Sequence, residues 1–469
     1  ILNLLPISVM EFDEKIKKLS PEKMQAIVEK LQYLINSGYV TIYEQNGIIE
    51  YRLTQSGEEL REEIKKKLLS EIKLAEEFEI HPAGGVIPQI KLWYEPINEK
   101  EFVYNWNGTK GIAVIKEAKG GLHYLEIEGK RFWFNSPPLN EKELSVFNKL
   151  NPTIIYDWVN GKRKPLSTNE MWEKVYNYFK TFFDFSEEIN YTMVTLTVFL
   201  SYLKHLLPAT WYLLIYGEFG GGKTTLGELI SLLSYHGCKI ANMSISFIGR
   251  GLDRLRITPF IDEFDAVNDE ELLALVRQGY RRGQKYARIN KEGMKPEIFD
   301  IYTNWIISIH GMAEEALTTR AFPILVSETQ DRILPIINLA KENYANTLYN
   351  ELMIWWGENS VKIMEKLGNP LGEVENNSQL SKDEIFKSCT KYLTKEDVEK
   401  LTKATGRSME LGYLMLLSSR IIGIELDIQK VFETMESMMD EIRETGIIGS
   451  LRDYLVKLYK ELKYNPNFR

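Results

Sequence analysis

The spacing of apolar residues changes several times along this chain, and each change predicts a different element. Over residues 20–37 the apolar residues recur at helical spacing, which predicts an amphipathic helix. The runs 39–43 and 48–53 alternate as strands do, and Asn46-Gly47 lies between them, which predicts a β-hairpin. Up to about residue 69, the pattern therefore predicts helix, helix, hairpin and helix.

Residues 82–138 carry a second pattern, of short alternating runs separated by turns such as Gly120-Gly121. This pattern predicts a small antiparallel β unit. Helical spacing returns over Met171–Phe183 and Tyr191–Leu207. The wholly apolar run Trp211–Tyr216 then predicts a buried strand.

These patterns, with the helical character of the chain after Val326, divide it into four expected domains. With 469 residues, of which 44% are hydrophobic, the chain is long enough for several cores. The predicted fold class is α/β, with a parallel sheet flanked by helices in the third domain. The expected boundaries are 1–80 for the first helices and hairpin, 81–164 for a β-rich domain, 165–330 for the α/β core and 331–469 for an α-helical region.

Composition limits what the chain can contact. Its net charge is -8, so a nucleic-acid contact would have to come from local basic clusters. The two cysteines, Cys238 and Cys389, have no metal-binding or disulfide spacing, which favours a reducing, cytoplasmic location. Lys204 and Pro208 interrupt the longest apolar run, residues 193–216, so we expect no membrane span.

The clearest motif is Gly217–Thr224, which follows a strand-like run and precedes a helix-like run. This is the spacing of a phosphate-binding P-loop, whose small residues let backbone amides turn toward the β- and γ-phosphates of ATP. Lys223 would reach the same phosphates, and the Thr224 hydroxyl would ligate Mg²⁺. A flexible glycine-rich loop, the alternative, would not explain Lys-Thr at a helix start. The predicted nucleotide ligands are Gly217, Gly220, Gly221, Gly222, Lys223, Thr224 and Thr225.

A second motif is the apolar run 257–261 that ends in Asp262-Glu263, the pattern of a Walker B strand. Asp262 would hold Mg²⁺ through its water shell, and Glu263 would accept a proton from the attacking water. Pro259 is a poor residue for a central strand and argues against this assignment. The alternatives are a pair of surface acids in a loop, and Asp265 in either role.

A basic cluster follows in this otherwise acidic chain. It predicts a hairpin loop that tracks nucleic-acid phosphates, with a turn near Asn290 and Gly293. A solvated face or an inter-subunit salt-bridge patch is the alternative, and Arg281 or Arg282 could instead reach a neighbour's nucleotide. The predicted nucleic-acid contacts are Arg281, Arg282, Lys285, Arg288 and Lys291.

Two further features precede the predicted helical region, and the first has polar side chains that could sense the γ-phosphate. The apolar strand 304–310 carries Asn304, Ser308 and His310, which compete for a sensing role. Arg320 comes just before the last predicted strand, Ile324–Val326.

Residues 174 to about 326 resemble the AAA+ ATPase modules of ring helicases, and more closely the helicase part of primase–helicase proteins from archaeal plasmids and viruses. The resemblance implies that an arginine, here Arg320, acts on the ATP of the neighbouring subunit. It also implies a helical lid with a second arginine, for which Arg407 and Arg420 are candidates. The residues that carry the resemblance are Gly217–Thr224, Asp262-Glu263, the Arg281-Arg282-Gly283 turn with Arg288, and Thr319-Arg320.

The N-terminal part, up to about Leu69, resembles the winged helix-turn-helix domains of prokaryotic DNA-binding proteins. It carries the Leu-Thr-x-x-Gly sequence that is typical after the wing, here Leu53 to Gly57. The resemblance implies that the helix over 20–37 enters a major groove and that the wing touches phosphates. A winged helix that docks onto a protein is the alternative.

Together these features predict an ATP-hydrolysing, ring-forming DNA translocase or helicase, a hexamer that serves replication of a mobile element. Single-stranded or duplex DNA is the expected partner. The alternative is an initiator or transcription-regulator switch that uses ATP for assembly on DNA without unwinding. A small-molecule kinase is disfavoured, because a kinase needs an acceptor pocket and no water-activating Glu.

Overall fold

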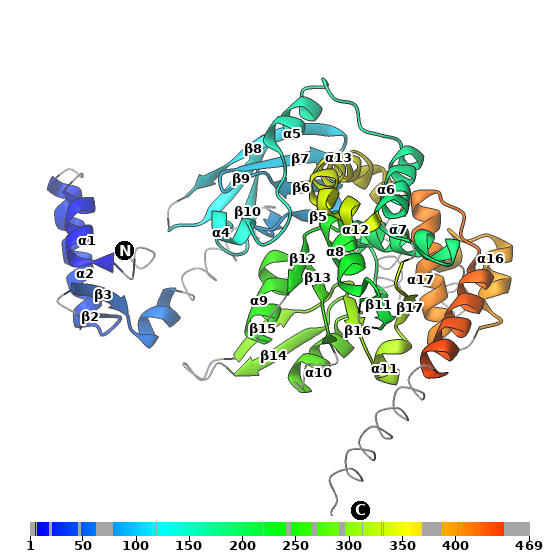
Figure 1. Ribbon diagram of the computed structural model, residues 1–469. Coiled ribbons are helices and arrows are strands. Elements are labelled where there is room, and N and C mark those ends of the chain that lie inside the picture. Colours follow the sequence, from blue (N-terminus) through cyan, green and yellow to red (C-terminus); the bar gives the residue numbers. More distant parts are fainter. Residues whose placement is uncertain are drawn as a thin grey trace, which may run out of the picture. The chain divides into compact units, whose positions relative to one another are not determined.

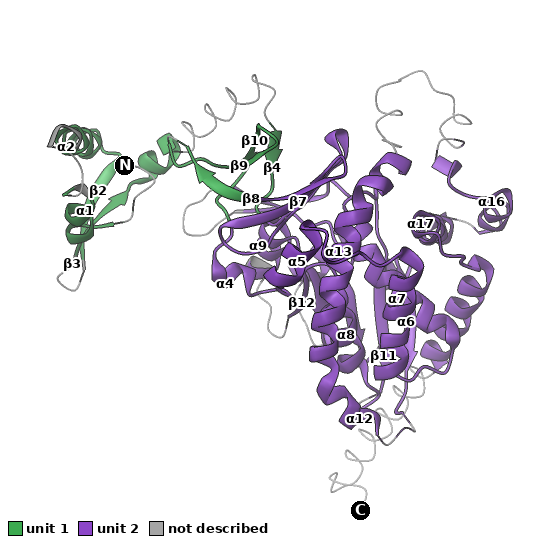
Figure 2. Ribbon diagram, turned by 90° about the horizontal axis from the view of Figure 1, so that it is seen from above, with its two compact units in different colours: residues 1–82, 113–138 green, residues 83–112, 139–469 purple. Residues whose placement is uncertain are grey.

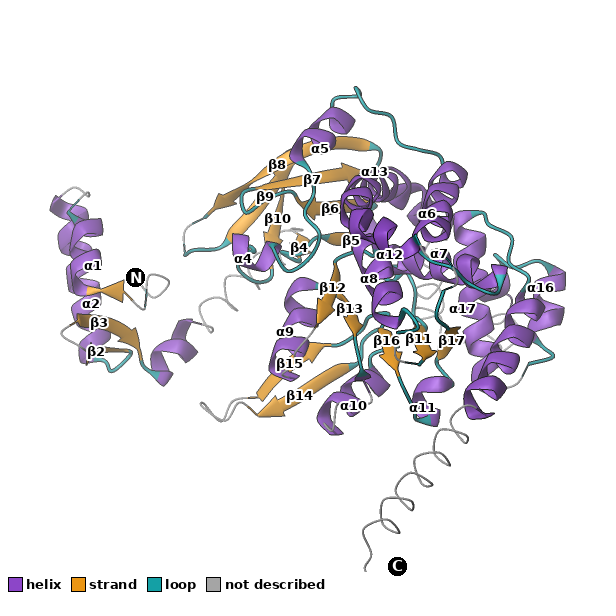
Figure 3. Ribbon diagram, in the orientation of Figure 1, coloured by secondary structure: helices purple, strands orange, loops and turns teal. Residues whose placement is uncertain are grey.

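The computed structural model is a mixture of helices and strands (Figure 1, Figure 3). It divides into two compact units, residues 1–82 with 113–138 and residues 83–112 with 139–469 (Figure 2). The structure describes residues 5, 7–17, 21–45, 48–61, 78–118, 120–218, 220–240, 245–264, 270–289, 296–311, 313–329, 331, 333–367, 387, 389–404 and 406–444.

Unit 1 begins with two helices and a three-stranded antiparallel sheet in the order β1-β3-β2. Gly38, with φ +74°, lets the chain turn out of the second helix. The predicted helix and the two hairpin strands are confirmed, while the third strand of this sheet was not predicted. The hairpin turn at Asn46-Gly47 lies outside the described residues. The elements are β1 (Ile7–Ser8), α1 (Val9–Ile16), α2 (Pro21–Asn36), β2 (Val40–Gln45) and β3 (Ile48–Leu53).

A second group of strands follows, and strand β8 passes from unit 2 into unit 1. The strand order in unit 1 is β4-β10-β9-β8, and in unit 2 it is β8-β7-β6-β5. The predicted antiparallel pairing is found between β5 and β6, β6 and β7, β8 and β9, and β9 and β10, whereas β10 and β4 are parallel. The elements are β4 (Phe78–Ile80), β5 (Gly85–Ile87), η2 (Pro88–Ile90), β6 (Leu92–Pro96), β7 (Glu101–Trp106), β8 (Thr109–Glu117), β9 (His123–Ile127) and β10 (Lys130–Phe134).

Unit 2 also contains a five-stranded parallel sheet in the order β12-β13-β16-β11-β17. Because the strands are parallel, their carboxyl ends all lie at one edge of the sheet, where ligands bind in open α/β folds. The strands are β11 (Tyr212–Gly217), β12 (Gly237–Ile240), β13 (Thr258–Ile261), β16 (Ile306–Ile309) and β17 (Ala321–Val326). A separate antiparallel hairpin is formed by β14 (Lys285–Ile289) and β15 (Pro296–Asp300).

Much of the rest of unit 2 is helical, including residues 428–444. No helix among the described residues has both the length and the apolar character needed to cross a membrane. The helices are α4 (Glu141–Leu144), α5 (Pro152–Val159), α6 (Thr168–Phe182), α7 (Glu188–Leu203), α8 (Lys223–Leu233), α9 (Ile245–Leu255), α10 (Glu270–Gln278), α11 (Glu315–Thr318), α12 (Leu334–Ile337), η4 (Asn338–Ala340), α13 (Lys341–Leu367), α16 (Lys395–Leu401) and α17 (Gly406–Ile422).

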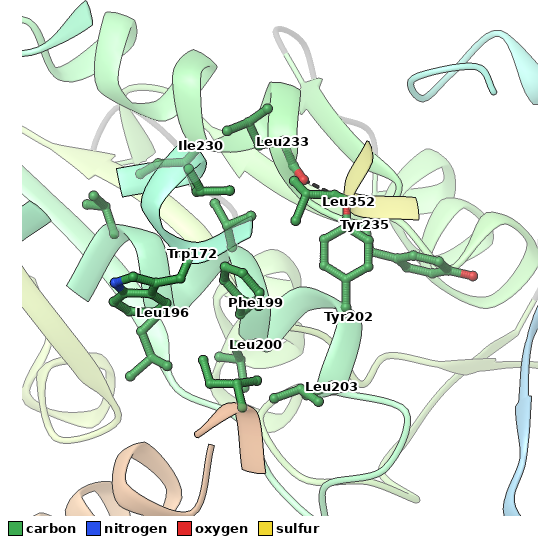
Figure 4. Packing of buried hydrophobic residues seen from close by; sticks show 14 of the residues in the cluster. Trp172, Leu196, Phe199, Leu200, Tyr202, Leu203, Ile230, Leu233, Tyr235 and Leu352 are labelled. Carbon is green, nitrogen blue, oxygen red and sulfur yellow. Dashed lines mark hydrogen bonds between the residues drawn. The ribbon is translucent and has the colours of Figure 1, made fainter. Parts of the chain in front are cut away.

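The parallel sheet separates two hydrophobic cores. Leu213 and Ile215 of β11 join a core built with α6, α7, α8 and α13, while Leu214 and Tyr216 join a core built with α9, α10 and α11. Successive residues of a strand point to opposite faces, so β11 is buried on both faces, as its apolar run predicted. Figure 4 shows part of the first core, where the Tyr202 hydroxyl donates to the Leu233 carbonyl at 2.9 Å.

Strand β6 is joined to the parallel sheet by a buried polar contact. Both oxygens of the Glu95 carboxylate are engaged, one by the Tyr235 hydroxyl at 2.7 Å and the other by His236 Nε2 at 2.5 Å. The His236 ring also stacks on Phe147, with 4.0 Å between ring centroids. Since an unpaired buried carboxylate would be costly, this pairing holds β6 in one place beside the start of β12.

Candidate functional site

The loop between β11 and α8 has a backbone that depends on glycine. Gly220 (φ +82°) and Gly222 (φ +88°) adopt left-handed conformations, and Gly222 is the N-cap of α8. At Gly217 a Cβ atom would lie 2.3 Å from the Val326 carbonyl oxygen of the neighbouring strand β17. The glycines of the predicted P-loop are therefore required by its turns and by its close approach to β17. Phe219, within the motif, lies outside the described residues.

Another glycine brings α8 close to the sheet. A Cβ atom at Gly227 would lie 2.1 Å from the Phe260 ring of β13, so the helix approaches β13 more closely than any other residue would permit. The start of α8, which carries Lys223, Thr224 and Thr225, is thereby held beside the carboxyl edge of the sheet.

Lys223 is buried beneath the loop and reaches two of its carbonyl groups. Its ammonium group donates to the carbonyl oxygens of Gly217 (2.5 Å) and Glu218 (2.8 Å), and lies 3.0 Å from His310 Nδ1. His310 directly follows β16, so a group predicted only as one of three sensing candidates contacts the P-loop lysine. A phosphate that binds Lys223 would compete with these carbonyl groups for the ammonium protons.

Three elements bring oxygen atoms together around Asp262. The Thr224 hydroxyl on α8 donates to Asp262 Oδ2 at 2.8 Å, and the Ser308 hydroxyl on β16 donates to Asp262 Oδ1 at 2.6 Å. Ser308 Oγ also accepts a hydrogen bond from the backbone N–H of Glu263 at 2.9 Å. The Ser308 hydroxyl therefore contacts both acids of the predicted Walker B pair: it bonds the carboxylate of Asp262 and the backbone N–H of Glu263.

Glu263 has an unusual backbone and an exposed side chain. Its φ is +52°, a left-handed conformation that non-glycine residues adopt at a cost. The side chain is 59% exposed, with one carboxylate oxygen 3.7 Å from His310 Nε2. The carboxylate is therefore exposed at the carboxyl edge of the sheet. Asp265, the predicted alternative, lies outside the described residues.

The oxygens of Thr224 and Asp262 fit a magnesium ion. Hydroxyl and carboxylate oxygens are ligands that Mg²⁺ prefers, and it usually binds through one or two carboxylates together with phosphate oxygens and water. In the described ranges, no group of three or more His, Cys, Asp or Glu side chains could hold a metal ion. These two residues would therefore hold Mg²⁺ only together with the phosphates of a substrate.

Two of the predicted residues lie at the other edge of the sheet. Arg320 directly precedes β17, and its carbonyl accepts from the Tyr212 N–H at the start of β11 (3.0 Å). Strand β11, from Tyr212 to Gly217, separates this edge from the P-loop. At the usual rise of a strand, its length is about 16 Å. Asn304 precedes β16 and is fully buried. The structure thus places Ser308 and His310 near the P-loop, but neither Asn304 nor Arg320.

Arg407 also lies at the amino edge of the sheet. It belongs to the first turn of α17, and its guanidinium donates to Thr319 Oγ1 at 3.3 Å. Arg420, the other candidate for a second arginine, pairs with Asp397 at 3.0 Å near the end of the same helix. The structure therefore brings Arg407, but not Arg420, to the neighbourhood of Arg320.

The predicted nucleic-acid residues do not form one basic surface. Lys285 and Arg288 lie on the β14–β15 hairpin, and each pairs with an acid of the opposite strand, Asp300 at 3.0 Å and Glu297 at 2.6 Å. The predicted hairpin is confirmed by this strand pairing, while its charges are largely balanced. Its turn, with Asn290, Lys291 and Gly293, lies outside the described residues.

Arg281 and Arg282 lie before the hairpin, at the amino edge. Arg281 pairs with Glu410 of α17 at 2.8 Å. Arg282 donates to the Lys204 carbonyl at 3.1 Å. Both therefore have protein partners, and neither belongs to the hairpin that sequence spacing assigned to them.

Ser308 was one of three residues in its strand that competed for a sensing role. Its only signal was a hydroxyl within an otherwise apolar strand, which favours a polar partner across the sheet. The partner became evident only from the strand order, because β16 lies next to β13 and β11.

Comparisons with known proteins add little to this geometry. No protein-family model matches the chain, and no curated protein matches it. A solved structure with some likeness is a JCV helicase bound to a thiazolopyridine-phenoxyphenyl acetamide, at 14% sequence identity and a TM-score of 0.25. The match covers 55% of this chain and 66% of the helicase chain, so this chain spans slightly less than two thirds of that length.

Proposed function

We propose that this chain is an ATPase that moves along nucleic acid, acting as a ring-forming DNA translocase or helicase. The observation that carries the proposal is the meeting of Lys223, Thr224, Asp262 and Ser308 at the carboxyl edge of a parallel sheet, around a loop that requires glycine. Backbone amides, an ammonium group and a hydroxyl–carboxylate pair are the groups that bind a magnesium triphosphate.

In the proposed reaction the P-loop amides and Lys223 bind the triphosphate. Thr224 and Asp262 would hold Mg²⁺, which neutralises the charge that develops on the phosphates. Glu263 accepts the proton of the attacking water, and its exposed carboxylate supports this role. Ser308 positions Asp262 and the Glu263 backbone, and His310 lies between Lys223 and Glu263.

The proposal includes sites shared between copies of the chain. Arg320 lies at the amino edge, about 16 Å from the P-loop of its own chain by the rise of β11. An arginine at that distance can stabilise a γ-phosphate only if the phosphate belongs to another copy. We therefore propose a closed ring with Arg320 supplied in trans, and six as the number of subunits.

DNA is the proposed track, and replication of a mobile element the proposed setting. The β14–β15 hairpin and the N-terminal helices would provide the contacts. A second candidate is a switch in which ATP controls assembly on DNA without unwinding. The balanced charges of the hairpin, where Lys285 and Arg288 pair with acids, favour this candidate over a strongly basic translocation loop.

The test is ATP turnover with and without single-stranded and duplex DNA, together with strand displacement. We expect Lys223→Ala to abolish turnover, and Glu263→Gln to keep ATP binding while slowing turnover by about 10²- to 10⁴-fold. Lys362→Ala is the control, since that side chain is 66% exposed on α13. Turnover retained in Lys223→Ala would refute the P-loop as the site of ATP hydrolysis. DNA-stimulated turnover without strand displacement would favour the switch.

A further inference from the structure

Three arginines from separate parts of unit 2 meet at the amino edge of the parallel sheet. Arg281 follows α10, Arg320 precedes β17, and Arg407 lies in the first turn of α17. The guanidinium carbons of Arg320 and Arg281 lie 4.6 Å and 5.2 Å from the centre of the Tyr280 ring. We call Arg281, Arg320 and Arg407 the arginine site.

Two members of the arginine site lie beside a hollow that a carboxylate partly fills. Arg320, Arg407 and Tyr280 line it together with Glu410, and its volume is about 10 Å³, which is room for a single water molecule. The Glu410 carboxylate pairs with Arg281 at 2.8 Å. It is the one acid among the described residues that line the hollow.

The charges of the arginine site are not fully balanced. Three like charges in one place are unfavourable unless an anion lies among them, and Glu410 supplies one negative charge. Arg320 Nε is buried without a hydrogen-bond partner among the described residues, and buried donors are rarely left in this state. The first turn of α17, a 17-residue helix, adds the positive end of its dipole.

We infer that the Glu410 carboxylate occupies the arginine site until the phosphate proposed above arrives, and that it competes with this phosphate for the same guanidinium groups. Carboxylate and phosphate oxygens make the same charge-assisted pairs with arginine. Because the hollow has no room for a phosphate beside Glu410, the ligand enters only as this carboxylate moves away. Glu410 thus restrains the arginines until a stronger anion arrives.

The source of the phosphate rests on the proposed function: it is the triphosphate of a nucleotide held by a second copy of the chain. The side chains of Arg281 and Glu410 are 51% and 34% exposed, so the arginine site opens to the surface, where a second copy can reach it. Its distance from the P-loop of the same chain excludes that chain's own nucleotide.

Binding of inorganic tripolyphosphate tests the arginine site directly. The background is Lys223→Ala, which weakens the P-loop, and the measurement is calorimetric titration. We expect Glu410→Gln to tighten binding by about threefold to fivefold, the size of an exposed ion pair, and Arg320→Ala to abolish it. Glu410→Ala should act in the same direction as Glu410→Gln. The matched control is Glu396→Gln, a 75% exposed glutamate paired with Lys400, which should change nothing.

Unchanged affinity in both Glu410 variants would overturn the competition, and binding that survives Arg320→Ala would overturn the site.

A second measurement identifies the source of the phosphate. Subunits with Lys223→Ala and Glu410→Gln, mixed with Arg320→Ala subunits, should hydrolyse ATP faster than the same mixture with Glu410 intact. Equal rates, with tighter tripolyphosphate binding, would overturn the second copy as the source. Because tripolyphosphate binding needs no ATP turnover, an inactive unmodified chain would refute the proposed function and leave the first result standing.

Discussion

Single hydrogen bonds decide where the acids of the candidate site point. Ser308 donates to Asp262 and accepts from the Glu263 N–H, so one hydroxyl supports a carboxylate and a left-handed backbone turn at once. A hydrogen bond to a charged group is worth about 1.5–3 kcal/mol. Ser308 is therefore a positioning residue, whose effect is exerted through Asp262 and Glu263.

Replacing Ser308 by Ala should lower kcat for ATP by about 10- to 100-fold, because 1.4 kcal/mol corresponds to a factor of ten. The KM for ATP should change much less, since Lys223 and the loop amides remain. Ser308→Thr keeps the hydroxyl and should recover most of the rate. Ser418→Ala is the control, because that buried hydroxyl has no partner in the described part of the chain. A kcat unaffected by Ser308→Ala would contradict the positioning role.

Lys204 provides a pH-dependent test of the buried amino edge. It is 2% exposed, and burial lowers its pKa to about 7 from the ordinary value of 10.5. At a pH between these two pKa values, the Lys204 side chain is protonated in the unfolded chain but not in the folded chain. The free energy of unfolding therefore rises with pH over this range. The expected slope is about 1.4 kcal/mol per pH unit.

Lys204→Met should remove this rise, because methionine has no proton to lose. The measurement is the urea midpoint of unit 2 unfolding at pH 7, 8 and 9. Lys362→Met, at a side chain that is 66% exposed, should keep the slope of the unmodified protein. The same slope in Lys204→Met would show that another group titrates.

At the scale of elements, the β14–β15 hairpin has two different faces. Phe299 is 6% exposed while its neighbour Ile298 is 60% exposed. On the inner face, Phe299 packs against Gly249 of α9, and Glu297 pairs with both Arg288 and Arg250. Lys285 is paired in register with Asp300, on the same face as Ile298. The two basic residues that looked equivalent in sequence therefore lie on opposite faces.

Because Lys285 and Arg288 lie on opposite faces, replacing each by alanine should have a different effect. Lys285→Ala should weaken DNA binding and lower the salt slope by about one, if the outer face meets phosphates. Arg288→Ala should instead raise hydrogen exchange in β14 and β15, because it removes the ion pair that joins β14 to Glu297 of β15. Salt titration of DNA affinity and exchange mass spectrometry measure the two effects. An unchanged slope in Lys285→Ala would exclude the outer face from DNA contact.

For the whole molecule, the length of the sheet separates two sets of charged groups. Lys223, Asp262 and Glu263 lie at the carboxyl edge, whereas Arg320 and Arg407 lie at the amino edge, about 16 Å away by the rise of β11. No rearrangement within a rigid parallel sheet joins these edges. The two sets can serve one reaction only between copies.

Mixing subunits tests this sharing. Lys223→Ala and Arg320→Ala proteins should each be inactive, and a mixture should regain part of the ATP turnover because some interfaces combine an intact P-loop with an intact arginine. Particle mass, measured with and without ATP, should show the assembly. Absence of rescue at every mixing ratio would mean that each site is complete within one chain.

Local sequence determined the elements that local physics controls. The glycines of 217–222 adopt backbone angles and close approaches that other residues resist, so the strand–loop–helix unit was predictable. The apolar runs identified β11, β13 and β16, because strands buried on both faces carry no polar alternation. The β2–β3 and β14–β15 hairpins were predictable from the turn residues between their strands, and the first also from its alternation of apolar and polar residues. A third strand before α1 was missed, since two residues are too few for a periodic signal.

Only the tertiary structure decided which distant residues meet. The strand order β13-β16-β11 places Ser308 beside Asp262 and leaves Asn304 at the opposite edge, although both lie in one apolar segment. Arg281, Arg320 and Arg407 converge because the elements that carry them end at the same edge of the sheet. Spacing along a chain predicts contacts within a turn of helix or a hairpin, whereas these contacts depend on how the strands are ordered in space.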